Sequence, residues 1–180
     1  MNIKESNEPW KHWIIDDFLN QKQVKILQDF SADYIREHNT EKRFELDHLQ
    51  GKERKVLLSA IKQMPKVVQS FNYQPPRKYK KLYPLGHLAV NPAGFSWHPH
   101  TDYITKIWTF VTYIGPVNSI GTYLMSNKAE ADKIEIPWKP GRCLVFAGSD
   151  DTWHSYLSGN NWRSTITAYL SSDKDWQNKL

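Results

Sequence analysis

The first part of the chain carries apolar side chains at helical spacing. A short apolar run over residues 13–19 predicts a strand, and after it the apolar positions recur every three or four residues. This spacing predicts an amphipathic helix with a stripe formed by Val24, Leu27, Phe30, Tyr34 and Ile35. A second helix should begin after Gly51, with a buried stripe formed by Leu57, Leu58, Ile61, Met64, Val68 and Phe71. Pro65 lies inside this second helix and should kink or split it, because proline lacks a backbone N–H.

From residue 79 the pattern changes to short runs of β-branched and aromatic residues, separated by Gly, Pro and Asn. These runs predict strands in KLYPLGHLAV, KIWTFVTYI, GTYLM, DKIEIPW, RCLVFAG, TWHSYL and WRSTITAYL. Helices followed by antiparallel strands indicate an α+β fold that is mainly β. We expect one domain over residues 1–180, with helical N-terminal support over 1–75 and a β core over 79–172.

The composition restricts the class of protein but does not indicate a function. The chain has 24 Lys and Arg against 19 Asp and Glu, and its basic residues gather at 51–55 and 75–81. We interpret both clusters as solvated surface, with nucleic-acid contact as the less favoured alternative. Cys143 lies in an apolar run and should be a core side chain. The chain starts without a signal-like segment and has no apolar run of membrane-spanning length, so we expect a soluble, cytoplasmic protein.

The last two predicted strands bring polar side chains together. The sequence SGNN at residues 158–161 lies between them and suits a four-residue hairpin loop. In that hairpin Tyr156 would lie opposite Arg163, and His154 would lie opposite Thr165. The period-2 alternation of a strand would then place all four side chains on one face, which could line a cavity.

The segment SWHPHTDYITK, residues 96–106, contains candidate metal ligands. His98, His100 and Asp102 would share one face of a regular strand, and His154 could supply a further ligand. Two histidines and one carboxylate leave three positions of an iron ion open, which is typical of non-haem Fe(II) oxygenases. A three-histidine site formed by His98, His100 and His154 is the alternative.

The open positions also suit a co-substrate. Two of them can accept a chelating 2-oxo acid, and the third can accept dioxygen. Arg163 follows His154 by nine residues and would offer a planar fork to the distant carboxylate of that acid.

His100-x-Asp102, His154 and Arg163 resemble, in order and approximate spacing, the motif of the Fe(II)/2-oxoglutarate-dependent oxygenases. WIIDDFLNQKQVKIL resembles the first strand and helix of the prolyl-hydroxylase-like branch. HTDYITKIWTFVTYI, GTYL, WKPGRCLVFAG and TWHSY are similar to core segments of compact bacterial and phage members. The resemblance implies a double-stranded β-helix, a cupin-like jelly roll with the metal at its mouth and the N-terminal helices packed against one sheet.

The resemblance also implies residue roles. His100, Asp102 and His154 would bind Fe(II), and His98 would lie at the rim or hydrogen-bond a neighbour. Thr165 matches a hydroxyl position that in relatives often helps to hold the 2-oxoglutarate carboxylate. Lys106 or Thr109 could also meet the co-substrate, although a solvated lysine and a packed threonine are equally good interpretations. The remaining histidines are interpreted as ordinary surface or core residues: His12, His38, His48 and His87.

The implied activity is a dioxygenase that uses Fe(II), 2-oxoglutarate and O2, releases succinate and CO2, and could be stimulated by ascorbate. Related halogenases lack the carboxylate ligand, so Asp102 favours hydroxylation. Peptide side chains, such as prolyl residues, and free small molecules are both compatible substrates. Two other functions stay open: a non-catalytic cupin-like module that binds a metal or ligand, and an oxygenase that acts on nucleic acid. The sequence indicates no oligomeric state and no membrane partner.

Overall fold

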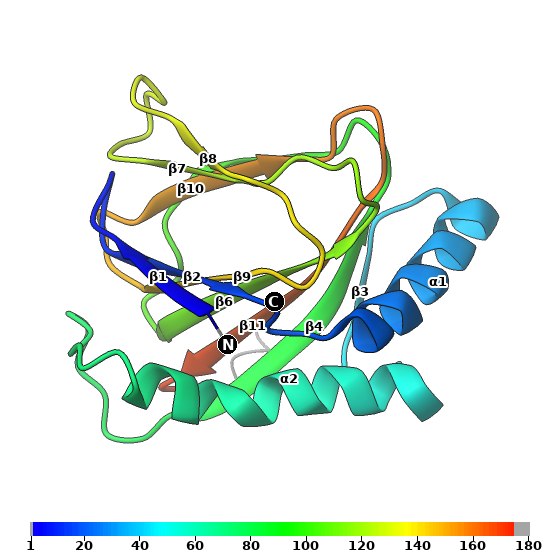
Figure 1. Cartoon of the computed structure of the whole chain (residues 1–180). Coiled ribbons are helices and arrows are strands. Elements are labelled where there is room, and N and C mark those ends of the chain that lie inside the picture. The colour runs from blue at the N-terminus through cyan, green and yellow to red at the C-terminus, as the bar shows by residue number, and fades with distance from the viewer. Residues whose placement is uncertain (1, 175–180) are drawn as a thin grey trace.

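The computed structural model describes residues 2–174 (Figure 1). Within these residues two helices and eleven strands follow one another along the chain. The N-terminal elements are β1 (Asn2–Ser6), β2 (His12–Asp16), α1 (Gln21–His38), β3 (Lys42–Phe44) and α2 (Gly51–Gln69). The later strands are β4 (Tyr83–Asn91), β5 (Ser96–His100), β6 (Lys106–Gly115), β7 (Thr122–Met125), β8 (Ile134–Ile136), β9 (Cys143–Ala147), β10 (Trp153–Leu157) and β11 (Arg163–Ser171).

The strands form two antiparallel sheets that face each other (Figure 1). The larger sheet has the order β1-β2-β9-β6-β11-β4-β3, and the smaller sheet has the order β5-β10-β7-β8. From β4 to β11 the chain passes back and forth between the sheets, and only β7 and β8 are consecutive strands of the same sheet. This winding is the double-stranded β-helix that the sequence led us to expect, so the predicted fold class is confirmed.

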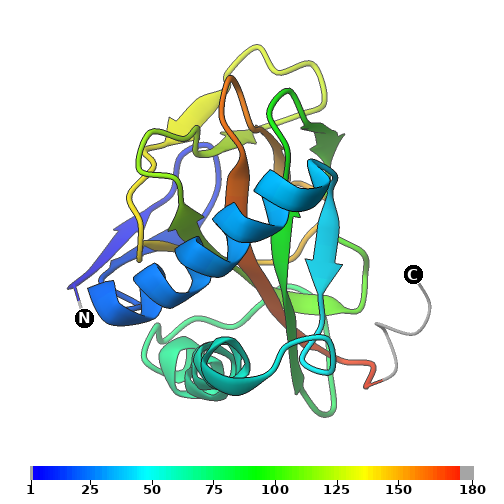
Figure 2. The same cartoon turned by 90° about the vertical axis from the view of Figure 1, so that its right-hand side faces the viewer.

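Both predicted helices form and cover the outer face of the larger sheet, with α1 crossing in front of the strands in Figure 2. Helix α1 begins at a capping box in which Asn20 and Gln23 exchange hydrogen bonds. Helix α2 packs against β4 and β11. Its buried face consists of Val56, Leu57, Ala60, Ile61, Met64 and Val67, whereas Leu58 and Val68 are only half-buried. Neither described helix is long and apolar enough to cross a membrane.

Pro65 does not split α2, which runs unbroken to Gln69. Of the two predicted effects, a kink or a split, the split was wrong because the proline lies close to the end of the helix. It removes one backbone donor where only one further turn follows, and the packing of Ile61, Met64 and Val67 in the core outweighs that loss.

The N-terminal part contributes strands as well as helices. β2 continues the larger sheet beside β9, and Trp13 on β2 stacks on Phe71 with ring centroids 4.4 Å apart. β1 and β3 were not expected from the sequence. β1 is exposed along most of its length and β3 is three residues long, so neither shows the alternation that predicts a strand.

The predicted hairpin between the last two strands does not form. β10 pairs with β5 and β7 in the smaller sheet, whereas β11 pairs with β4 and β6 in the larger one. The intervening loop crosses from one sheet to the other and hydrogen-bonds a distant loop, through Ser158 N to Phe95 O and Gly94 N to Gly159 O. His154 and Thr165 are therefore not cross-strand partners. A loop of hairpin length does not reveal that its two strands have better partners elsewhere in the chain.

Candidate metal centre

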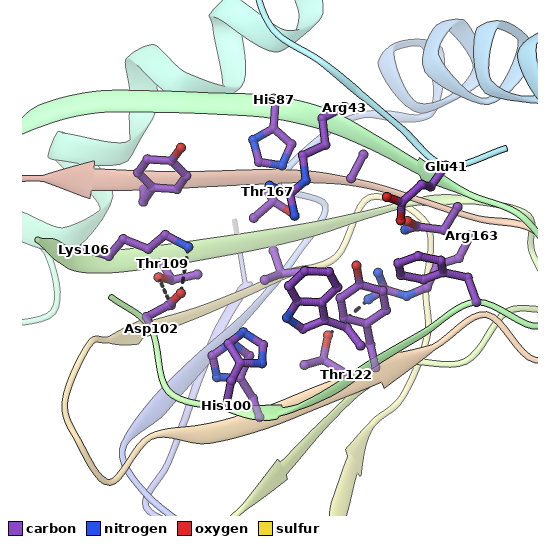
Figure 3. A pocket seen from close by; sticks show the side chains of 18 of the residues that line it. Glu41, Arg43, His87, His100, Asp102, Lys106, Thr109, Thr122, Arg163 and Thr167 are labelled. Carbon is purple, nitrogen blue, oxygen red and sulfur yellow. Dashed lines mark hydrogen bonds and ion pairs between the residues drawn. The ribbon is translucent and has the colours of Figure 1, made fainter. Parts of the chain in front are cut away.

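A cavity of about 450 Å³ lies between the two sheets. It is lined from the smaller sheet by residues of β5 and β10 and from the larger sheet by residues of β4, β6 and β11 (Figure 3). The predicted ligands and the predicted arginine come from different sheets but reach this one cavity. The site therefore forms between two facing sheets and not on one face of the predicted hairpin.

Three of the predicted ligands lie together. His100 ends β5 and is the cross-strand neighbour of His154 on β10, with ring centroids 4.2 Å apart. Asp102 lies two residues beyond the end of β5. One ligand atom from each of the three residues lies within 4.8 Å of the others. His98 is not part of this group, and its side chain is exposed.

The two histidine rings are oriented for metal binding. Nδ1 of His100 lies 2.9 Å from the carbonyl oxygen of His98, and Nδ1 of His154 lies 3.0 Å from that of Thr152. Because a carbonyl oxygen only accepts, each Nδ1 carries the proton and donates. Nε2 of each ring then keeps its lone pair free for a metal, and its orientation is set by the backbone. The residues present therefore fit a two-histidine, one-carboxylate site.

The electrostatics keep the ligands in their metal-binding forms. Burial by itself raises the pKa of Asp102, but the ammonium group of Lys106, the nearby His154 and two hydrogen bonds together hold that pKa well below its usual range. Lys106 Nζ donates to Asp102 Oδ1 over 2.8 Å, and the Thr109 hydroxyl donates to Oδ2 (Figure 3). Burial lowers the pKa of His154 to about 4, although the Asp102 charge opposes this. At neutral pH Asp102 is therefore an anion and His154 is neutral.

Arg163 lies at the start of β11 and is 1% exposed. Its guanidinium carbon is 4.2 Å from the ring centroid of Tyr156, and Nη2 donates to Thr122 Oγ1 over 3.3 Å. Burial lowers the pKa of Arg163, but an arginine stays protonated at such a site. Among the ion pairs of the described residues, none includes Arg163. A buried cation that has no anionic partner among residues 2–174 is a suitable site for an anionic ligand.

Of the other predicted site residues, two line the cavity and one does not. Lys106 and Thr109 line the cavity, where they contact Asp102. Thr165 shares the cavity-facing side of β11 with Arg163 but is buried and does not line the cavity itself. Thr167, two residues further, does line it and lies 3.5 Å from the Thr165 hydroxyl oxygen. A role for these side chains in co-substrate binding stays a prediction.

Several cavity residues were missed by the sequence argument. His87, Ala89 and Asn91 line the cavity from β4. They alternate with Leu88 and Val90 along the strand, and this alternation could have indicated a face that is not part of the apolar core. Glu41 and Arg43 reach the cavity from the chain around β3, which pairs with the edge of β4 (Figure 3). No sequence pattern indicated this, because β3 is too short to show a period.

The chain matches no protein-family model and no curated protein by sequence. Solved structures do match. A prolyl-4-hydroxylase from Pseudomonas putida is 18% identical with a TM-score of 0.67, over 89% of this chain and 91% of that one. A prolyl hydroxylase from Trichoplax adhaerens, in complex with a peptide of hypoxia inducible factor, is 15% identical with a TM-score of 0.69, over 94% and 87% of the two chains.

A viral collagen prolyl hydroxylase from Paramecium Bursaria Chlorella virus-1, described as a 2-oxoglutarate complex, is 14% identical with a TM-score of 0.61. It aligns over 88% of this chain and 94% of its own length. At these identities the likeness concerns the fold. The chain thus has the jelly-roll fold of prolyl hydroxylases, and the match covers most of this chain and most of each of these structures.

Proposed function

We propose that this protein is an Fe(II)- and 2-oxoglutarate-dependent dioxygenase that hydroxylates its substrate. The observation that carries the proposal is the joint occurrence, in one cavity, of a two-histidine, one-carboxylate group and a buried arginine that forms no ion pair among the described residues. A metal-binding module without catalysis would need the first but not the second. The fold shared with prolyl hydroxylases supports the same conclusion.

The proposal assigns a role to each group. Nε2 of His100, Nε2 of His154 and the Asp102 carboxylate would hold Fe(II). Arg163 would bind the distant carboxylate of 2-oxoglutarate, with Thr122 as the neighbour that fixes its guanidinium. Fe(II) with this co-substrate supplies oxidation by O2, which yields succinate, CO2 and a hydroxylated product. The chain itself would bind and orient the reactants in the cavity between the two sheets.

The Asp102 carboxylate supports hydroxylation as the outcome, because as a metal ligand it would take the coordination position that a halide would need. For the substrate, the Trichoplax neighbour was solved with a peptide, which supports a peptide side chain as the first class to test. Free small molecules form the second class.

The test measures product and succinate together. Purified protein with Fe(II) and 2-oxoglutarate is incubated with prolyl-containing peptides and with a small-molecule panel under ¹⁸O₂. We expect one labelled oxygen in the product and one succinate per turnover. Single alanine substitutions of His100, Asp102 and His154 should each abolish Fe(II) binding in anaerobic titrations, whereas His98→Ala should keep most of it. Product oxygen drawn only from water, or unchanged iron affinity in Asp102→Ala, would contradict the proposal.

A further inference from the structure

Asp102 is supported differently from the two histidines. His100 and His154 belong to paired strands, so the ladder between β5 and β10 fixes their backbone. Asp102 lies beyond the end of β5, in the segment that connects it to β6, and pairs with no strand. Its backbone therefore depends on other contacts.

Arg77 supplies those contacts. Nη1 donates to the carbonyl oxygens of Tyr103 over 2.8 Å and Lys106 over 3.2 Å, and Nη2 donates to that of Asp102 over 3.0 Å. One guanidinium thus binds three carbonyl groups of the segment that carries the metal-ligating carboxylate. Among residues 2–174 its acidic partner is Asp150, whose carboxylate lies 3.2 Å away and whose side chain is 96% exposed, whereas the Arg77 side chain is 10% exposed.

The larger sheet leaves space for this guanidinium at Gly148, just after β9. A Cβ atom on residue 148 would lie 2.4 Å from the Lys106 carbonyl oxygen and 2.8 Å from Arg77 Nη1. No Cβ atom tolerates such distances, so any larger residue at position 148 would push the arginine or the segment away. The position of the Arg77 guanidinium therefore depends on a glycine at residue 148.

We propose that Arg77 is a positioning residue for the metal centre, which holds Asp102 in place through the backbone of residues 102–106. Arg77 belongs to the basic cluster at residues 75–81, which the sequence argument interpreted as a solvated surface. The planar fork of arginine suits this task, because its several donors leave in fixed directions. This inference rests on the proposed metal site, and it goes beyond that site by assigning a residue that does not touch the metal.

The experiment measures metal affinity separately from stability. Mn(II), used in place of Fe(II) to avoid oxidation, is titrated into wild-type protein and variants and followed by electron paramagnetic resonance. Arg77→Met removes all donors but keeps an apolar stem. We expect its Mn(II) dissociation constant to rise about tenfold or more, the range typical for lost support of a metal ligand. Asp150→Asn keeps the three carbonyl contacts and should stay within about twofold of wild type.

Arg142 provides a matched control that does not line the cavity. It is similarly buried, with 15% of its side chain exposed, and binds Asp16 and the Pro137 carbonyl oxygen. Arg142→Met should lower the stability to urea without changing Mn(II) affinity. Equal losses of Mn(II) affinity in Arg77→Met and Arg142→Met, or wild-type affinity in Arg77→Met, would overturn the role of Arg77.

Two further variants keep the inference testable if Arg77→Met does not fold. Arg77→Lys retains the charge but not the fork, and Gly148→Ala places a Cβ atom against both the Lys106 carbonyl oxygen and the Arg77 guanidinium. Each should weaken Mn(II) binding, and wild-type affinity in both would refute the inference. His100→Ala separates the two proposals. If it too binds Mn(II) normally, the metal site itself is wrong, whereas loss in His100→Ala alone rejects only the part played by Arg77.

Discussion

Replacement of Arg163 by methionine should separate ligand binding from stability. Methionine fills a similar volume among the aromatic rings of Tyr113, Trp138 and Tyr156 but carries no charge. In the ligand-free protein the guanidinium is buried, forms no ion pair within residues 2–174, and has one side-chain acceptor, Thr122 at 3.3 Å. Its removal should therefore leave the free energy of unfolding unchanged or raise it.

The effect on 2-oxoglutarate should have the opposite sign. Loss of a buried, charge-assisted contact costs about 2–5 kcal/mol of binding free energy, which corresponds to about 30-fold to about 4,000-fold in the dissociation constant. Because Arg163 is only 1% exposed, solvent does not screen the contact, and we expect a loss of at least about 100-fold. Mn(II) affinity should be kept, since Arg163 is not among the metal ligands.

The assay is anaerobic calorimetry of 2-oxoglutarate binding to the Mn(II)-loaded protein, with urea unfolding of the metal-free protein beside it. Arg163→Lys serves as the control that keeps the charge and loses the fork, so its affinity should lie between those of wild type and Arg163→Met. A dissociation constant within threefold of wild type in Arg163→Met would refute the assignment. A large loss of stability in that variant would refute the argument about the unpaired buried charge.

Two predictions concern stability. Burial lowers the pKa of His87 to about 3, so the folded state resists protonation; stability is fully present above pH 6.5 and is lost as the pH falls toward 3. Between pH 6.5 and pH 5 the protonation of His87 in the unfolded chain should lower the free energy of unfolding by about 1.5 kcal/mol. Urea unfolding of His87→Gln should lack this part of the pH dependence. The same change in the free energy of unfolding with pH in the variant and in wild type would contradict the prediction. Leu57 is 0% exposed, so Leu57→Ala should lower the free energy of unfolding by about 2–5 kcal/mol, and Leu58→Ala, on the half-buried side of α2, by clearly less in the same measurement.

The sequence predicted those features that depend on residues close to one another in the chain, namely the periodic apolar patterns and the His100-x-Asp102 part of the metal-ligand motif. The apolar stripes located both helices, and the short β-branched runs located most strands. The ligand group His100, Asp102 and His154 could be proposed because residue types and motif order carry that information without any knowledge of which strands pair.

The failures came from long-range pairing. The hairpin argument brought His154 and Arg163 together for the wrong reason, since β10 and β11 lie in different sheets and meet across the cavity. Thr165 does lie on the cavity-facing side of β11, but Thr167, two residues further along that side, is the one that lines the cavity. Arg77 could not be found because its acceptors are backbone carbonyl groups some 25 residues away. Every residue has such a group, so the sequence does not indicate which carbonyl groups accept a hydrogen bond.

The division of the site between two sheets has a consequence for how the molecule opens. The histidines belong to β5 and β10 of one layer, whereas Arg163 belongs to β11 of the other. A small molecule held at both ends would act as a non-covalent crosslink between the layers. Its binding free energy would add to the cost of parting them by mass action. Ligand occupancy would then couple the two sheets, so that local opening of one would require release of the ligand from the other.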